Sequence, residues 1–309
     1  MDIWTTIKSP VQSLEDEITR EHDISVHIKR EDLNHSEIIG NKLRKLKYNL
    51  IEAKQQRASA LLSFGGAYSN HILALSAAGR IFNIPTIGII RGEELLKAPL
   101  NPVLQQAKLN GMDLHFVSRE SYKRRAQANY LVSLQERFGD CYIMPEGGSN
   151  QLGVQGAAEI VEDIGSDYDA IACACGTGGT LAGIIKGVCT QGFLSSKVIG
   201  FSVLKGGGFL RNDIENMLPE DISTRVSWHV NTDYHLGGYA RSNTTLIDFL
   251  QWFKATHQIE LDTIYTGKMV YGIYDLIQSG FFKKGSRLLL IHTGGTQTAK
   301  LMMGNDATI

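Results

Sequence analysis

Several features that would place a protein in a special class are absent from this sequence. The 309 residues carry a formal net charge of −1, so no long-range attraction to nucleic acid or to an anionic membrane surface is expected. No apolar run approaches the ~20 residues that a membrane span requires. The first residues, MDIWTTIKSP, lack the basic start and apolar core of a signal peptide. We therefore expect neither a nucleic-acid partner nor a membrane partner.

Cysteine and proline are scarce. The four cysteines form no paired framework of the kind found in small secreted domains, which predicts a reduced, cytoplasmic location. Cys173 and Cys175 alternate on an expected strand, so both should face the same side of it. Because no further Cys or His stands nearby at ligand spacing, we expect no metal site. Only six prolines and no low-complexity linker occur, so composition marks no domain boundary.

What the sequence does have is a regular alternation of short apolar runs and amphipathic segments. Strands are expected in SVHIKRED, ALLSFGG, PTIGIIRG, DLHFVS, CYIMPEGG, DAIACACG, KVIGFSVL and RLLLIHTGG. Helices are expected between them, for example in NKLRKLKYNLIEAK, SYKRRAQANYLVSLQERFG and KMVYGIYDLIQ. This order is typical of α/β proteins whose parallel sheets are covered by helices on both faces, and two sheets are expected rather than one of ten strands. Ligands of such folds bind beyond the carboxyl ends of strands, so the strand-to-helix turns are the candidate sites.

The turn CGTGGTLAG follows one expected strand and opens a helix. Its glycines would let the backbone approach an anion, and the helix N-terminus adds unpaired N–H groups. Thr177 and Thr180 add hydroxyl donors. The turn lacks the Gly-Lys-Ser/Thr of a P-loop, and Leu181 stands where a dinucleotide fingerprint has its third glycine. The turn is therefore a candidate phosphate site, and a tight connection without a ligand remains an alternative.

A second turn, SFGGAYSNH, places three polar residues in a row at the start of a helix. Ser69 or Asn70 alone could be an N-cap, and His71 alone could be a structural histidine. Capping explains one polar residue but not three, so this turn is also a candidate site.

Two further turns end in polar residues. In LLLIHTGG, Thr293 at the end of the strand is better placed for a ligand than His292, which lies on the apolar strand itself. In LDTIYTGK, Tyr265 and Thr266 precede an amphipathic helix, although Tyr265 by itself could be an ordinary buried aromatic.

Lys42 lies near the start of a helix with Arg44 and Lys45 close behind it. Positive charge there opposes the helix dipole. A lysine attacks a carbonyl only when it is unprotonated, and nearby cations together with burial lower its pKa. The cluster therefore indicates a reactive amine, with a solvated basic helix face as the alternative.

Six motifs occur together in the order and spacing of one family: GNKLRKL, SFGGAYSNH, EGGSN, GTGGTLAG, YTGKMVYG and HTGG. On these the chain resembles the D-cysteine desulfhydrase / 1-aminocyclopropane-1-carboxylate (ACC) deaminase branch of pyridoxal 5'-phosphate (PLP) enzymes. The resemblance implies the tryptophan synthase β-like fold (fold type II), with two parallel-sheet, three-layer domains. It implies a larger domain at residues 1–47 and 154–309, a smaller domain at 48–153, and a homodimer acting on a small amino acid.

The resemblance also implies roles for individual residues. Lys42 would form the Schiff base with PLP, and Asn70 would hydrogen-bond the phenolic oxygen of the cofactor. The phosphate would be held by the glycine-rich turn with the help of Lys45. The residues of this turn are Gly176, Thr177, Gly178, Gly179 and Thr180.

Ser69, Asn70 and His71 would lie against the substrate carboxylate, and Tyr239 and Tyr265 match the two active-site tyrosines of the family. The family usually reads Gly-Gly-Asn-Lys before and at the lysine. Here Ile39 replaces the first glycine, which could alter the backbone before Lys42.

Two positions bear on the reaction. The deaminase type is expected to carry Glu and Leu where this sequence has Thr266 and Thr293, which resemble the desulfhydrase type. A carboxylate beside the pyridine nitrogen would keep it protonated, whereas a hydroxyl favours a neutral ring and a weaker electron sink. The expected reaction is α,β-elimination on D-cysteine, with Lys42 removing the α-proton and Ser69 and Tyr265 assisting.

Three alternatives stay open at this stage. The nearest is ACC deaminase, and another is elimination, racemisation or dehydration of a different small amino acid. The third is a non-catalytic protein that binds a phosphorylated metabolite in the glycine-rich turn.

Overall fold

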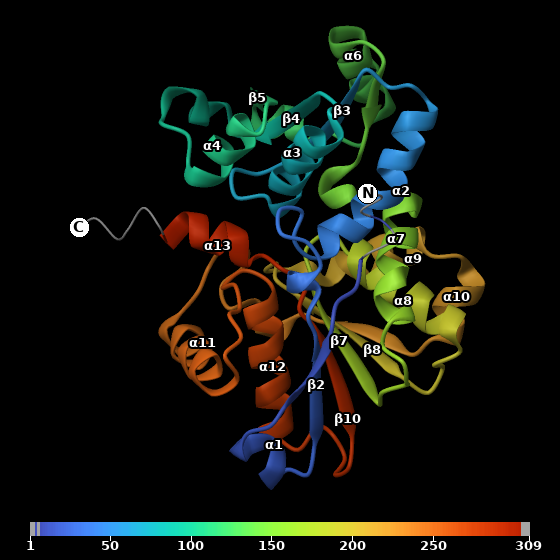
Figure 1. Ribbon diagram of the computed structural model, residues 1–309, viewed down its shortest axis with the longest axis vertical. Coiled ribbons are helices and arrows are strands. Elements are labelled where there is room, and N and C mark those ends of the chain that lie inside the picture. Colours follow the sequence, from blue (N-terminus) through green and yellow to red (C-terminus); the bar gives the residue numbers. More distant parts are fainter. Residues whose placement is uncertain (1–3, 5–6, 304–309) are drawn as a thin grey trace.

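A computed structural model describes residue 4 and residues 7–303, so parts of both ends of the predicted larger domain lie outside the described residues. The chain forms two separate sheets, one above the other in Figure 1. The lower sheet has six strands in the order β1 (Val11–Leu14), β2 (Ser25–Lys29), β10 (Arg287–Ile291), β7 (Ala170–Cys175), β8 (Lys197–Ser202) and β9 (Trp228–Asn231). The upper sheet has four strands in the order β5 (Met112–Val117), β4 (Thr86–Arg91), β3 (Ala60–Gly65) and β6 (Cys141–Ile143).

All strand pairs are parallel except β1 with β2. The parallel pair β2 and β10 joins the two ends of the chain side by side, blue against red in Figure 1. The edge strands β1 and β9 were not expected from the sequence. Both are short, and all four residues of β9 are only partly buried, so neither has the continuous apolar run of the central strands.

The helices of the large sheet lie on both of its faces. They are α1 (Glu17–Glu21), α7 (Gln151–Glu162), α8 (Gly179–Gln191), α9 (Leu210–Met217), α10 (Glu220–Arg225), α11 (Thr244–His257) and α12 (Thr266–Gln278). Successive side chains of a strand point to opposite faces, and β7 shows this directly. Cys173 and Cys175 pack with α7 and α8, as expected from their spacing, whereas Ala172 and Ala174 pack with α11 and α12.

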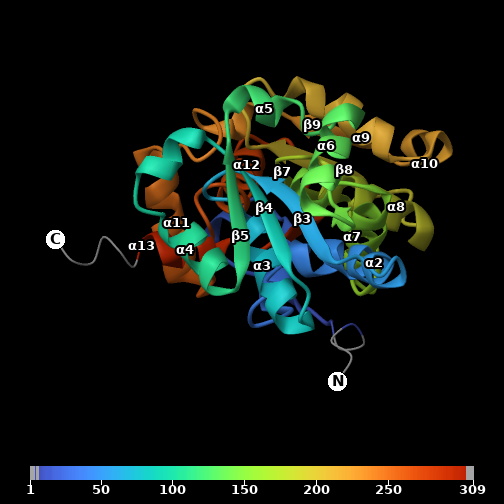
Figure 2. The ribbon, with the colours of Figure 1, turned by 90° about the horizontal axis from the view of Figure 1, so that it is seen from above.

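The small sheet is layered in the same way. Its helices are α2 (Asn41–Gln55), α3 (Asn70–Phe82), α4 (Pro102–Leu109), α5 (Arg119–Lys123) and α6 (Ala128–Phe138), and α13 (Thr296–Met303) contacts α4. Figure 2 looks down on this sheet and shows β5, β4 and β3 side by side. Leu61 packs with α2, α3 and α4, and Leu62 packs with α5 and α6. Both domains expected from the sequence are thus helix–sheet–helix layers of the predicted fold class, while the domain boundaries themselves stay a prediction.

One helix prediction was wrong. The segment SYKRRAQANYLVSLQERFG forms two helices, α5 and α6, separated by a turn at residues 124–127. Tyr122 at the end of α5 is buried against the sheet, and the turn directs Arg125 to Glu146. These tertiary contacts override the helical pattern of the sequence.

Helix α2 lies between the two sheets and packs closely on α7. A Cβ at Gly156 of α7 would stand 1.9 Å from the Arg44 carbonyl oxygen, so only glycine permits this approach. The Arg44 guanidinium makes two hydrogen bonds of 3.0 Å to Glu31, whose side chain is fully buried. Arg44 also contacts Asp163 at 3.3 Å. This ion-pair network fixes the start of α2 relative to the large sheet.

We expect Glu31→Gln to lower the free energy of unfolding by about 3 kcal/mol, because the buried Arg44 would lose its two charge-assisted hydrogen bonds of 3.0 Å and keep the 41% exposed Asp163 as its closest carboxylate. Denaturant unfolding followed by circular dichroism measures the change. The control is Glu37→Gln, which breaks the exposed pair with Arg80 and should cost less than about 1 kcal/mol. Equal losses in the two variants would contradict this account.

Candidate active site

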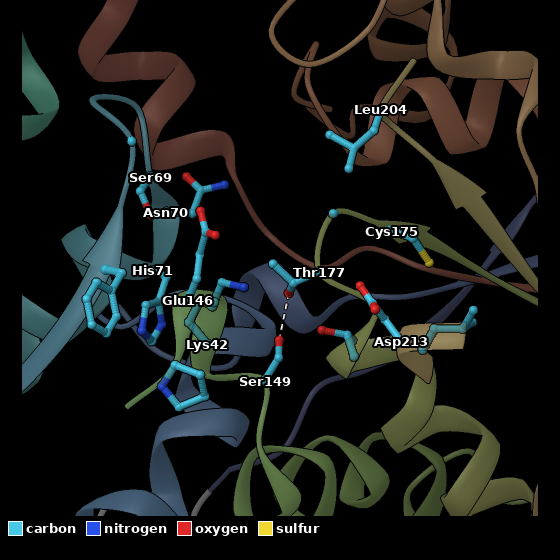
Figure 3. A pocket seen from close by; sticks show the side chains of 18 of the residues that line it. Lys42, Ser69, Asn70, His71, Glu146, Ser149, Cys175, Thr177, Leu204 and Asp213 are labelled. Atoms are coloured by element: carbon cyan, nitrogen blue, oxygen red, sulfur yellow. Dashed lines mark hydrogen bonds between the residues drawn. The ribbon is translucent and has the colours of Figure 1, made fainter. Parts of the chain in front are cut away.

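A cavity of about 810 Å³ lies where the carboxyl ends of strands from both sheets converge. Residues expected at the site from the sequence line it: Lys42, Ser69, Asn70, His71, Gly176, Thr177, Gly178, Thr180, Tyr239, Tyr265 and Thr293. Lys45, Gly179 and Thr266 do not line it but stand directly behind it. Figure 3 shows Lys42 with Ser69, Asn70 and His71 on one side of the cavity and Thr177 on the other. The turns chosen from the sequence therefore meet in one place.

Lys42 is the second residue of α2, and among the described residues nothing hydrogen-bonds its Nζ. Burial lowers the pKa of Lys42 to about 8, so a larger share of its amine is neutral near pH 7 than in an exposed lysine, although the protonated form still predominates. The expected cause was partly wrong, since Arg44 turns away from the cavity into its pair with Glu31. Burial and repulsion from Lys42 hold the pKa of Lys45 well below its usual value.

The backbone before Lys42 tolerates the departure from the family pattern. Gly40, not Ile39, takes the positive φ of +79°, and a Cβ on Gly40 would stand 2.1 Å from the Thr293 carbonyl oxygen. The Asn41 N–H donates to that same carbonyl at 3.1 Å. Because Ile39 has no positive φ, a β-branched residue fits there without backbone strain.

The glycine-rich turn after β7 forms an open cradle at the N-terminus of α8. Gly178 caps this helix with a φ of +77° and contributes no side chain, so the first N–H groups face outward. A Cβ on Gly179 would stand 2.6 Å from the Ser149 Oγ and 2.7 Å from the Lys45 Nζ. The Lys45 Nζ donates to the Ser149 Oγ at 3.0 Å, and Ser149 and Thr177 are joined at 2.6 Å (Figure 3). Hydroxyl, ammonium and helix N-terminus thus converge on one small volume.

The SNH turn meets the cavity at the N-terminus of α3. The Ser69 Oγ caps the helix by accepting from the Ile72 N–H at 3.3 Å, which leaves its hydroxyl proton free to donate. The Asn70 Oδ1 accepts from the Thr298 hydroxyl, so the Asn70 amide N–H₂ remains available.

His71 is buried at the same turn, and burial together with Lys42 and Lys45 lowers its pKa well below the usual value. The Ser63 hydroxyl donates to the Met144 carbonyl and so accepts from His71 Nε2 at 2.9 Å, which leaves the buried Nδ1 as an unpartnered acceptor. Because Nδ1 can only accept in this tautomer, a substrate carboxylate at this turn would be held by the donors of Ser69, Asn70 and the helix N-terminus.

Two tyrosines cover the other side of the cavity. The rings of Tyr239 and Tyr265 pack edge to face with centroids 5.9 Å apart. Burial raises the pKa of Tyr265 well above its usual value, so its hydroxyl stays protonated. Lys268, itself buried, donates to the carbonyls of His235 and Gly238 at 2.8 and 2.7 Å and thereby holds the loop that carries Tyr239.

Thr266 and Thr293 form a pair of hydroxyls 3.3 Å apart at the base of the cavity. The neighbouring carboxylate of Asp262 is buried and accepts from the backbone N–H groups of Ile264, Tyr265 and Thr266 at 2.6 to 2.9 Å. Both Asp262 oxygens therefore hold the start of α12, and the residue of the hydroxyl pair that lines the cavity is Thr293, with Thr266 behind it.

Sequence reasoning missed several lining residues. Asn41 donates to the Thr180 hydroxyl at 2.7 Å and so joins the starts of α2 and α8. Ser149 lies within the quoted EGGSN motif, which could have identified it. Arg91, Arg125 and Glu146 also line the cavity, and no motif pointed to the two arginines.

These residues fit PLP. Lys45 is 1% exposed and, among the described residues, has no carboxylate within ion-pair distance. A bound phosphate would supply the anion that this buried amine lacks. The N-terminus of α8 has no side-chain cap, so this helix start and the glycine cradle admit a phosphate. Lys42 presents a free amine in the same cavity. No group of three metal-ligating side chains occurs in the part of the chain that the structure describes.

Comparison with known proteins agrees with this fit. Residues 6–294 match the family described as pyridoxal-phosphate dependent enzyme. The bifunctional D-cysteine desulfhydrase/ACC deaminase of Arabidopsis thaliana is 32% identical over 289 residues, which are 87% of this chain and 71% of that protein. A crystal structure of an ACC deaminase homologue has a TM-score of 0.82 at 27% identity and covers 97% of this chain and 94% of its own. A hydrogen sulfide-producing enzyme from Fusobacterium nucleatum shares the fold, with a TM-score of 0.67 at 12% identity and coverage of 96% and 98%.

Fold and cavity together define a PLP-dependent enzyme of fold type II, with the tryptophan synthase β-like arrangement of two sheets. Within that class, the chain belongs to the ACC deaminase / D-cysteine desulfhydrase family. Among the described residues, no helix is long and apolar enough to cross a membrane.

We expect Lys42→Ala to abolish the visible absorbance at about 410–430 nm that PLP shows when it is bound to a lysine. The purified variant and the wild type, both supplied with PLP, are compared by absorption spectroscopy. Lys47→Ala is the control, because Lys47 pairs with Glu159 outside the cavity and its variant should keep the band. A Lys42→Ala protein with an intact band would show that another lysine binds the cofactor.

Proposed function

We propose that this enzyme catalyses α,β-elimination on D-cysteine and releases pyruvate, ammonia and hydrogen sulfide. In this reaction the α-proton is removed and the Cβ–S bond breaks with its electron pair leaving on sulfur. Water then hydrolyses the released enamine to pyruvate and ammonia. PLP, when bound, supplies the electron sink that makes the α-proton acidic.

Each part of the cavity has a role in this proposal. Lys42 would bind the cofactor through its Nζ, and Asn70 would donate to the phenolic oxygen. The phosphate would be held by Lys45, Ser149 and the turn formed by Gly176, Thr177, Gly178, Gly179 and Thr180. Ser69, Asn70 and the N-terminus of α3 would bind the substrate carboxylate, with His71 behind them as an acceptor.

Proton transfer would depend on Lys42 and the residues around it. The Lys42 amine would take up the α-proton of the bound substrate, and its lowered pKa keeps part of it neutral for this task. Tyr265 remains protonated and can donate a hydrogen bond near the reacting atoms, together with the Ser69 hydroxyl. The edge-to-face packing of Tyr239 on Tyr265 orients that ring.

The observation that carries the choice of reaction is the hydroxyl pair of Thr266 and Thr293, with Asp262 committed to backbone amides. A hydroxyl beside the pyridine nitrogen favours a neutral ring, which suffices to expel a good leaving group such as thiolate. Opening a cyclopropane is harder and benefits from the stronger sink that a carboxylate provides. ACC deamination to 2-oxobutanoate is the second candidate, because the Arabidopsis relative is described as carrying out both reactions.

On the family resemblance we also propose a homodimer in the cytoplasm and a division into domains at residues 1–47 with 154–309 and 48–153. Closure of the smaller domain over the substrate would exclude water from the cavity.

The direct test is titration of the PLP-loaded enzyme with D-cysteine, L-cysteine and ACC. Absorbance follows binding, and sulfide, pyruvate and 2-oxobutanoate are assayed as products. We expect sulfide and pyruvate in equal amounts from D-cysteine, with slower reaction of L-cysteine. Release of 2-oxobutanoate from ACC without sulfide from D-cysteine would overturn the proposal in favour of the deaminase.

Combining Thr266→Glu with Thr293→Leu should shift activity towards ACC, because the introduced carboxylate would stabilise the protonated form of the pyridine nitrogen. The ratio of kcat/KM for ACC to that for D-cysteine should rise at least about tenfold, a change of roughly 1.4 kcal/mol in relative barrier. Thr266→Ser with Thr293→Ser keeps both hydroxyls and is the matched control. An unchanged ratio in a variant that still binds PLP would undercut the two-threonine argument.

A further inference from the structure

One group of charged side chains in the cavity has no role in the proposed reaction. Arg91 ends β4, Arg125 follows α5, and Glu146 follows β6, so all three stand at the carboxyl edge of the small sheet. All three line the cavity. We call these residues, with the Tyr122 ring between them, the arginine cluster.

The arginine cluster carries an excess positive charge. Glu146 is already neutralised, because its two oxygens accept from the Arg125 Nε at 2.7 Å and from the Tyr122 hydroxyl at 2.8 Å. The nearby Glu94 is paired with Arg119 at 2.8 Å. Arg91 is left without an ion-pair partner among the residues described, and its guanidinium lies 5.8 Å from the Tyr122 ring centroid. A cation fixed at a cavity wall without an anion is a site for an anionic ligand group.

The arginine cluster borders the substrate end of the cavity. Arg91 and Glu146 both act on the pKa of the Tyr239 hydroxyl, which places them within electrostatic reach of the active-site tyrosines. Figure 3 shows the Glu146 side chain close to those of Asn70 and Lys42. The phosphate cradle has its own cation in Lys45, so the cluster is not needed there.

The substrate carboxylate also has other partners. Ser69, Asn70 and the N-terminus of α3 offer donors and a positive dipole end for one carboxylate. Arg91 is exposed to solvent where it lines the cavity, whereas Thr293 at the base of the cavity is 9% exposed. An anion at Arg91 would therefore belong to the outer end of the substrate side chain.

We propose that Arg91, supported by Arg125 and Glu146, binds a negatively charged group at the end of the substrate side chain. The substrate class is then a small amino acid whose β-leaving group itself carries an anion. This inference rests on the proposed elimination and narrows its substrate. A cavity of about 810 Å³ offers room for a side chain longer than that of cysteine.

The test compares two esters that differ only in a terminal charge, O-acetylserine and O-succinylserine, each as D and L enantiomers. Elimination breaks the Cβ–O bond with the electron pair leaving on the carboxylate, and both esters give pyruvate and ammonia. Pyruvate release gives kcat/KM, and the absorbance change of bound PLP gives the binding constant. We expect the wild type to prefer the succinyl ester about tenfold, with the preference falling as salt is raised.

Arg91→Gln should remove this preference, while kcat/KM for the acetyl ester stays within about threefold of wild type. Arg137→Gln is the matched control, because it removes one exposed arginine of α6 that does not line the cavity, and it should keep the preference. Arg91→Lys should restore part of it, since the charge returns without the planar fork.

Three results would overturn the inference. Equal wild-type use and binding of the two esters would show that no anion is recognised. Equal losses for both esters in Arg91→Gln would show that Arg91 binds the carboxylate common to both. A wild type that releases pyruvate from neither ester nor from D-cysteine, although PLP is bound, would overturn the proposed elimination and this inference with it.

Discussion

The site depends on one constraint, which is that the Lys42 amine is buried without a carboxylate beside it. Lys42 must keep a lowered pKa, so no carboxylate can lie beside it, and yet it stands on a helix that begins with several cations. The fold meets this constraint by turning Arg44 to the opposite side of α2, where Glu31 and Asp163 neutralise it. The close approach at Gly156 holds α2 in that orientation. The ion-pair network that fixes α2 on the large sheet thus keeps Arg44 and its carboxylate partners away from the cavity side of α2.

Two carboxylates near the cavity are committed elsewhere. Asp262 accepts from three backbone amides at the start of α12, and Glu146 is held by Arg125 and Tyr122. The rest of the lining consists largely of hydroxyls, amides, a histidine of lowered pKa and cations without carboxylate partners, with Asp213 as one further carboxylate. Such a lining suits a cofactor and a substrate that both bring anions, because each anion then finds donors.

The sequence predicted the two parallel sheets, most strands and the four turns that meet in the cavity, because buried parallel strands and glycine-rich turns leave strong local patterns. It missed β1 and β9, whose residues are too exposed to show such a pattern. It joined α5 and α6 into one helix, since the break depends on contacts made by Tyr122 and Arg125. It found most of the residues that motifs carry, including those placed behind the cavity wall, but missed Asn41, Glu146 and Ser149, which also lie in quoted motifs. Arg91 and Arg125 lie outside any motif and were not found.

By itself, the sequence determined that the chain is an α/β protein, and it predicted a reactive lysine, a phosphate turn and two threonines that bear on the reaction. These are matters of residue type and spacing along the chain. Only the tertiary structure decided why the pKa of Lys42 is lowered, since its burial and the direction of Arg44 depend on how α2 packs. It also decided that Arg91 stands without an ion-pair partner at the cavity wall, because charge balance is a property of residues brought together from distant segments and not of any one of them.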